Sequence, residues 1–135
     1  MIFKGICIKA DNNSNILGSI TELWDTMSKL YGEKNIKILR VNMDKNTCKY
    51  IVGLKRSWLK SDAKKMVERM LPGYDVSYEI VLIPNKNWNE LECHIKDIEK
   101  EYKRVSSDGK KVTFAVASYN RKKDTCEVKY NSEEI

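Results

Sequence analysis

The chain has 135 residues, of which 41% are hydrophobic and 33% charged, and its net charge is +6. This length fits one domain, and the hydrophobic share is large enough to form a buried core. Six glycines and two prolines exclude a collagen-like or linker-like chain. No apolar stretch approaches the roughly 18–20 residues that cross a bilayer. We therefore predict one soluble, cytoplasmic domain over residues 1–135, with no membrane contact.

The four cysteines, at positions 7, 48, 93 and 126, are too far apart for a zinc finger or ribbon, whose ligands come in closely spaced pairs. Three of them lie on alternating, strand-like stretches, where a free cysteine acts as a small core residue. We expect reduced thiols, no metal site and no cofactor.

The first half of the chain predicts a strand, a helix and a hairpin. Residues 2–9 alternate like a strand, and apolar residues spaced by three and four predict a helix over 16–31. Residues 36–43 and 47–54 predict an antiparallel hairpin. A short connecting helix is expected within residues 58–71, before Pro72 and Gly73.

The second half repeats this order. Residues 76–83 predict a strand, and the spacing of Trp88, Leu91, Ile95, Ile98 and Tyr102 predicts a second long helix. Residues 111–119 and 125–130 predict a hairpin, and residues 131–135 are expected to be frayed. The predicted fold is α+β. Two duplicated β-α-β-β modules, residues 2–54 and 76–130, form a mainly antiparallel sheet with two long helices and a cleft between the halves.

The sequence offers no standard catalytic motif. It contains no glycine-rich phosphate loop, no nucleophile elbow and only one histidine, His94, which the predicted second helix places beside Cys93. The basic residues are spread along the chain, so direct nucleic-acid binding is not expected. We predict no catalytic residues, and binding is favoured over catalysis.

Aromatic residues are the main candidates for a binding site, because their rings stack on flat molecules and attract cations. Trp24 lies on a helical stripe, where packing in the core is the simpler interpretation. Strand centres and element ends supply the others. The predicted ligand-binding set is Trp24, Tyr50, Tyr78, Trp88 and Tyr119.

The order of several short motifs resembles the GyrI-like small-molecule-binding family, which includes the effector-binding domains of multidrug-sensing transcription regulators. The motifs are residues 20–24 (ITELW), 50–53 (YIVG), 77–81 (SYEIV), Pro84 with Trp88, 117–120 (ASYN) and 126–130 (CEVKY). The resemblance implies non-catalytic binding of a small apolar or aromatic molecule, which could be cationic, by a stand-alone sensing protein.

One position departs from the family pattern. Members often carry a glutamate two residues before the fifth-strand tyrosine, and here that position is Ala117. Glu79 is the candidate to replace it. Strand alternation puts Tyr78 and Glu79 on opposite faces, so only one of them can line a given cleft.

Two alternatives stay open. A GyrI-like hydrolase of a reactive toxic compound would use Glu79 or Glu22 with aromatic walls. A protein-interaction module of the gyrase-inhibitor type would instead use its basic charge to find a protein partner.

Overall fold

The computed structural model describes residues 2–11, 17–42, 47–55, 59–84, 87–106 and 109–134. The helices in these ranges are α1 (Leu17–Tyr31), α2 (Ala63–Met70) and α3 (Ile98–Val105), with short 3-10 turns at Glu33–Asn35 and Ile95–Asp97. The strands are β1 (Ile2–Asp11), β2 (Ile36–Asn42), β3 (Thr47–Lys55), β4 (Val76–Leu82), β5 (Asn89–His94), β6 (Lys110–Asn120) and β7 (Thr125–Glu134).

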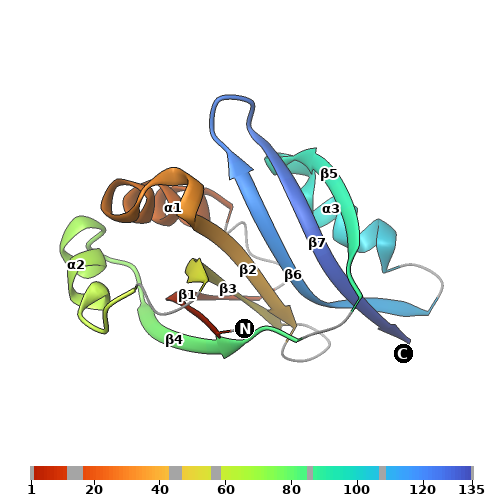
Figure 1. The fold of residues 1–135 in the computed structure, drawn as a ribbon, viewed down its shortest axis with the longest axis horizontal. Helices are drawn as coiled ribbons and strands as arrows, with labels where there is room; N and C mark the ends of the chain where they lie inside the picture. Colours follow the sequence, from red (N-terminus) through yellow and green to blue (C-terminus); the bar gives the residue numbers. More distant parts are fainter. Residues whose placement is uncertain are drawn as a thin grey trace.

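The seven strands form one antiparallel sheet in the order β4-β1-β3-β2-β6-β7-β5 (Figure 1). Its central strand, β2, pairs with β6 on one side, and Leu39 lies opposite Val116 in this pair. Strands β4 and β5 are consecutive in the chain but form the two opposite edges of this sheet. The segment that joins them therefore links opposite edges.

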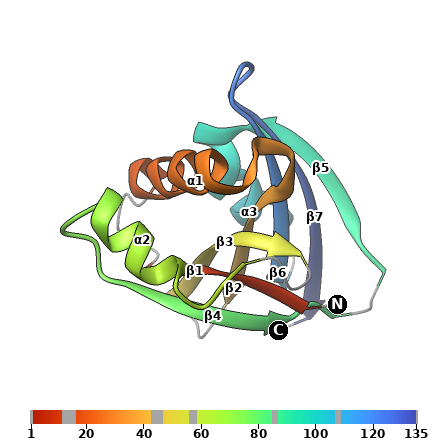
Figure 2. The same cartoon turned by 60° about the vertical axis from the view of Figure 1, so that its left-hand side comes forward.

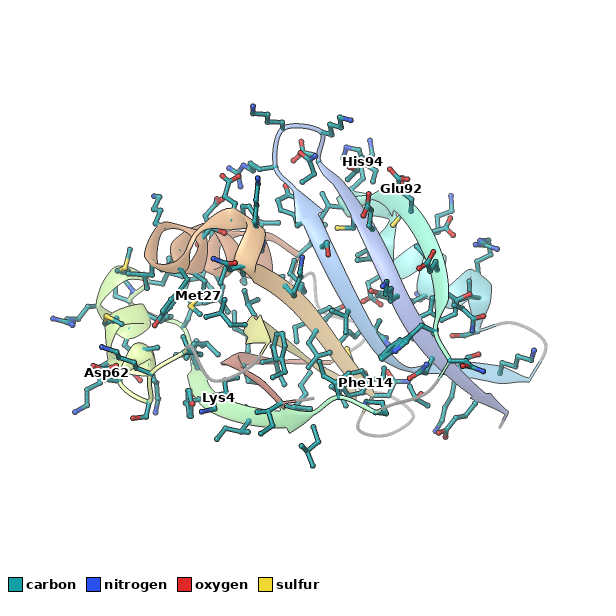
Figure 3. The ribbon with its side chains drawn as sticks, in the orientation of Figure 1. Lys4, Met27, Asp62, Glu92, His94 and Phe114 are labelled. Carbon is teal, nitrogen blue, oxygen red and sulfur yellow. The ribbon has the colours of Figure 1, made fainter. Side chains whose placement is uncertain are left out.

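All three helices pack on one face of the sheet (Figure 2). Apolar residues of each helix, such as Leu23 of α1, Val67 of α2 and Ile98 of α3, join one core cluster with alternate strand residues. Period-3.6 stripes on the helices and period-2 alternation on the strands bring these side chains to the same layer. Met27, which is labelled in Figure 3, belongs to this cluster.

A smaller apolar cluster lies on the opposite face of the sheet, and no described helix contributes to it. Phe3, Leu39, Ile51 and Phe114 are buried there, and Phe114 is labelled in Figure 3. Trp88 packs against the cluster from the segment between β4 and β5. This helix-free face carries a cleft, described below.

Two glycines allow β1 and β3 to approach closely. Gly5 lies directly opposite Gly53, and a Cβ atom built on Gly53 would collide with the backbone of Lys4. A Cβ on Gly5 would lie 2.6 Å from the carbonyl oxygen of Val52. Both positions therefore require a residue without a side chain.

Much of the predicted secondary structure is confirmed. The helix over 16–31, the strand over 76–83 and the two hairpins are present with boundaries shifted by a few residues. Cys7, Cys48 and Cys126 are buried on strands, as expected. Residues 12–16, which include the first residue of the predicted helix, and residues 43–46, which include the connection of the first predicted hairpin, lie outside the described residues.

The predicted second long helix is wrong. Residues 89–94 form β5, and only residues 98–105 are α-helical, so Cys93 and His94 lie on a strand. The pairing of β5 with β7 explains the difference, because it turns Leu91 and Cys93 toward the core opposite Val128 and Cys126. With α3 only eight residues long, α1 is the one long helix in the described chain.

The predicted fraying of the C-terminus is also wrong for most of this segment. The β6–β7 ladder continues to the pair Lys110–Glu134, and Asn131 is buried. The backbone hydrogen bonds of a long partner strand hold this end in place.

Candidate ligand-binding cleft

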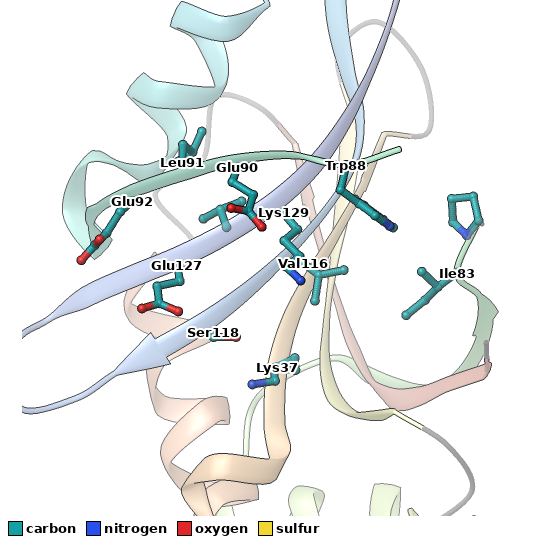
Figure 4. Close-up of a pocket in the computed structure, with 12 residues that line it drawn as sticks. Lys37, Ile83, Trp88, Glu90, Leu91, Glu92, Val116, Ser118, Glu127 and Lys129 are labelled. Atoms are coloured by element: carbon teal, nitrogen blue, oxygen red, sulfur yellow. The ribbon is translucent and has the colours of Figure 1, made fainter. Parts of the chain in front are cut away.

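A cleft of about 1130 Å³ lies on the helix-free face of the sheet, across β2, β6, β7 and β5 (Figure 4). Its lining combines apolar and charged side chains. The lining residues are Lys37, Ile83, Pro84, Trp88, Glu90, Leu91, Glu92, Val116, Ser118, Glu127, Val128 and Lys129.

One end of the cleft is apolar. Trp88 and Ile83 flank it, and Val116 lies between them and the charged end (Figure 4). The Trp88 ring contacts Phe114 in an edge geometry, with centroids 6.3 Å apart and planes at 62°. Through this contact, Trp88 packs against the apolar cluster on the helix-free face.

A hydrogen bond anchors the segment that carries Trp88. The buried side chain of Asn131 donates from Nδ2 to the carbonyl oxygen of Asn87 at 2.9 Å. The residue preceding Trp88 is thus tied to β7, and this limits the positions that the indole can take.

The other end of the cleft is charged. Glu90 of β5 lies opposite Lys129 of β7, and two residues further along, Glu92 lies opposite Glu127. Like charges that face each other across a strand pair are destabilising. The lining has three carboxylates and two ammonium groups, a net charge of −1 in a chain of net charge +6.

Of the five aromatic residues predicted to bind ligand, only Trp88 lines this cleft. Trp24 and Tyr50 are buried on the helix side, with 1% and 4% of their surface exposed. Tyr119 is half-buried beside Trp24, and their rings meet edge to face with centroids 4.8 Å apart. The structure therefore brings Trp24 and Tyr119 together and separates both from Trp88 by the thickness of the sheet.

Tyr78 and Glu79 point to opposite faces of β4, as strand alternation predicts. Tyr78 packs against the helix-side core and lines a separate shallow hollow. Glu79 forms an ion pair with Lys49, with Nζ and Oε2 2.9 Å apart, and does not line the cleft. Its charge is already balanced within the protein.

Ala117, the position of the family glutamate, faces the helix-side core opposite Ile38 and is buried. A ligand in the cleft on the other face would not contact this position. Glu22, the other candidate carboxylate, accepts a 2.7 Å hydrogen bond from the Tyr74 hydroxyl at the exposed surface of α1.

The charged residues of the cleft are the ones that sequence reasoning missed. The signal was present in residues 89–94, where Glu90 and Glu92 alternate with Leu91 and Cys93. Such alternation is typical of a strand with one buried and one open face. The competing helical spacing of the larger apolar residues concealed it.

The described residues include no cluster of three or more histidine, cysteine or acidic side chains that could hold a metal ion. The Nδ1 atom of His94 accepts a 3.3 Å hydrogen bond from the amide of Lys96. Burial raises the pKa of Cys93 and raises that of Cys126 to about 12, so neither thiol is an activated nucleophile.

None of the helices in the described ranges is long and apolar enough to cross a membrane.

Comparison with known proteins gives a partial similarity. No family model matches the chain. Over 66 residues, or 47% of its length, the chain is 33% identical to the ribonuclease P protein component of Mycoplasma mobile. The match spans 58% of that protein's length.

Proposed function

We propose that the protein binds a small apolar or aromatic molecule, without catalysis, in the cleft on the helix-free face of the sheet. The observation that carries this proposal is the cleft itself, in which an indole and a set of carboxylates line one space of about 1130 Å³. Ligand pockets typically measure about 300–1,000 Å³ and combine apolar walls with a few polar groups.

The two ends of the cleft favour a ligand with two parts. A flat ring packs against Trp88 and Ile83, and a positive charge lies toward Glu92 and Glu127. Placing a cation between these carboxylates relieves the repulsion of the facing pair. A protein of this kind acts as a sensor or as a sequestering agent.

The strand order supports the duplicated architecture that the sequence suggests. Counted from the outside inward, one side of the sheet has the order β1-β3-β2 and the other side the order β5-β7-β6. In each set the first, third and second strands of the set follow one another, and the two sets meet at the β2–β6 pair. Each set includes a helix between its first two strands in the chain, α1 or α3. In this proposal the second module starts at Asn89 instead of residue 76, and α2 with β4 connects the modules. The GyrI-like relationship is part of the same proposal.

The other candidate functions receive less support. The carboxylates considered for hydrolysis are engaged, Glu79 with Lys49 and Glu22 with Tyr74. The similarity to the ribonuclease P protein component covers less than half of the chain, so it gives little support to a role in ribonuclease P. Arg40, Lys49 and Arg121 also form ion pairs with carboxylates, which reduces the charge that they offer to a nucleic acid.

The test is a titration with a lipophilic aromatic cation and with a neutral compound of similar shape, followed by tryptophan fluorescence and thermal midpoint. We expect saturable quenching by the cation and stabilisation of roughly 2.7 kcal/mol at 100 times its dissociation constant. Trp88→Ala should weaken binding about tenfold, which equals about 1.4 kcal/mol.

Two glutamate variants serve as a matched pair. Glu127→Gln, in the cleft, should lower the affinity for the cation and leave the affinity for the neutral compound unchanged. Glu22→Gln, on α1, should change neither affinity. The proposed function is wrong if neither compound binds saturably, or if neither Trp88→Ala nor Glu127→Gln changes the affinity.

A further inference from the structure

An apolar strip runs along the β4 edge of the sheet. The exposed fractions of Ile2, Ile80 and Leu82 are 45%, 59% and 73%. Ile2 lies opposite Leu82 in the β1–β4 ladder, and all three residues belong to the helix-side face of their strands. Natural edge strands are usually short, charged or covered, so an exposed apolar edge indicates a pairing surface.

A shallow hollow lies next to this strip on the same face. It has a volume of about 660 Å³ and is lined by Lys4, Leu59, Lys60, Ser61, Asp62, Tyr78 and Ile80. Lys4 and Asp62 are on the side of the molecule away from Glu92 and His94 (Figure 3). The protruding Leu82 and the hollow at Tyr78 are four residues apart on one strand.

We propose that β4 pairs with β4 of a second copy of this chain as an antiparallel edge-to-edge dimer with Ile80 on the twofold axis. In this register Ile80 faces Ile80 of the second copy, and Leu82 faces Tyr78. Each Leu82 then lies against the hollow of the other chain. The contact is self-complementary, which a twofold interface requires.

Neighbouring registers are less favourable. With Glu79 on the axis, two carboxylates would face each other directly across the strand pair. With Val81 on the axis, Tyr78 would face Pro84, which has no N–H group to donate to the ladder. The Ile80 register avoids both, and it leaves Glu79 paired with Lys49.

The occupant is a second copy because this chain supplies both complementary parts, the exposed leucine and the hollow, at the spacing that antiparallel pairing needs. An unrelated extended peptide would need its own apolar side chain at that spacing. This inference does not depend on ligand binding in the cleft.

Sedimentation equilibrium of the full chain tests the dimer. We expect dimerisation in the micromolar range, weakened at least tenfold by Leu82→Lys. Met70→Lys is the control, because Met70 is 45% exposed like Ile2 but lies on α2, outside the β1–β4 ladder. A protein that stays monomeric up to about 1 mM would overturn the proposal, as would a dimer that Leu82→Lys leaves intact.

Crosslinking tests the register independently of any effect on folding. In a Cys93→Ser background, Ile80→Cys should be joined to its copy by a short bifunctional thiol reagent, since facing Cβ atoms lie about 4.5–5.5 Å apart. Leu82→Cys should crosslink far less, because in this register it faces Tyr78. Equal crosslinking at both positions, or at neither, contradicts the register.

Discussion

Glu92 of β5 lies directly opposite Glu127 of β7 at the charged end of the cleft. Two carboxylates that face each other across a strand pair reduce stability. Glu127→Gln should therefore raise the free energy of unfolding by about 0.2–1 kcal/mol. Urea denaturation measures this effect, with Glu22→Gln as the control.

The same substitution should lower the affinity for a cationic ligand, so stability and binding would change in opposite directions, as is common at functional sites. A variant that is destabilised, or that binds the cation more tightly, would contradict the role given to this pair.

Tyr119 provides a pH-dependent readout on the helix side. Its hydroxyl donates to Asp124 Oδ1 at 2.6 Å, and burial together with this hydrogen bond raises the pKa of Tyr119 to about 12. Because the folded pKa lies above the ordinary value near 10, the stabilisation is complete below pH 10 and is lost between about pH 10 and 12.

In Tyr119→Phe, the absorbance titration near 295 nm should lack one tyrosine that ionises with a midpoint near pH 12. The variant should also lose less stability between about pH 10 and 12. Tyr130→Phe is the control for a tyrosine elsewhere on the β6–β7 hairpin. An unchanged high-pH titration in Tyr119→Phe would show that the hydroxyl is not held as described.

Close packing of β1 and β3 makes the glycine pair sensitive to added volume. Gly53→Ala should destabilise the protein by about 1–3 kcal/mol, because its methyl group would overlap the backbone of Lys4. Gly18 is near the start of α1 with nothing within 4 Å of its would-be Cβ. Gly18→Ala should therefore be neutral or stabilising by up to about 1 kcal/mol. Equal effects of the two substitutions in thermal unfolding would contradict the strand register.

Arg40 of β2 connects the sheet to α3 on the helix-covered face. Its guanidinium is 3.1 Å from Glu99 of α3, donates to Asn42, and lies 4.9 Å from the centre of the Tyr102 ring. Arg40→Lys cannot keep the planar contact and both hydrogen bonds, so we expect a loss of about 1–2 kcal/mol in chemical denaturation.

Glu99→Gln should cost less than Arg40→Lys, because 44% of the Glu99 side chain is exposed and solvent screens the pair. A larger effect of Glu99→Gln would assign the stability to the ion pair instead of to the packing of Arg40.

The sequence predicted elements well where one periodicity dominated, as in α1 and in the hairpin of β2 and β3. It failed at residues 88–94, where Trp88, Leu91 and Ile95 fit a helix but Leu91 and Cys93 also fit a strand. Pairing with β7 decided in favour of the strand, and that contact is remote in sequence. Tertiary pairing of this kind overrides local preference.

The candidate site was only partly predictable for a related reason. Trp88 was recognised as an aromatic candidate, but alternation alone does not say which face of the sheet the helices cover. Helices α1 and α3 cover one face of the sheet, and Trp24 and Tyr50 are buried between the helices and that face. The cleft therefore lies on the other face, with Glu92 and Glu127. This assignment depends on the packing of whole elements.

Chemical-shift mapping of the ¹⁵N-labelled protein with a lipophilic aromatic cation tests ligand binding in the cleft most directly. The account predicts saturable shifts at the Trp88 indole N–H and at the amides of Val116 and Ser118, with Trp24 and Tyr50 unaffected. Shifts centred on Trp24 and Tyr50, or no saturable shift with any aromatic cation, would contradict it.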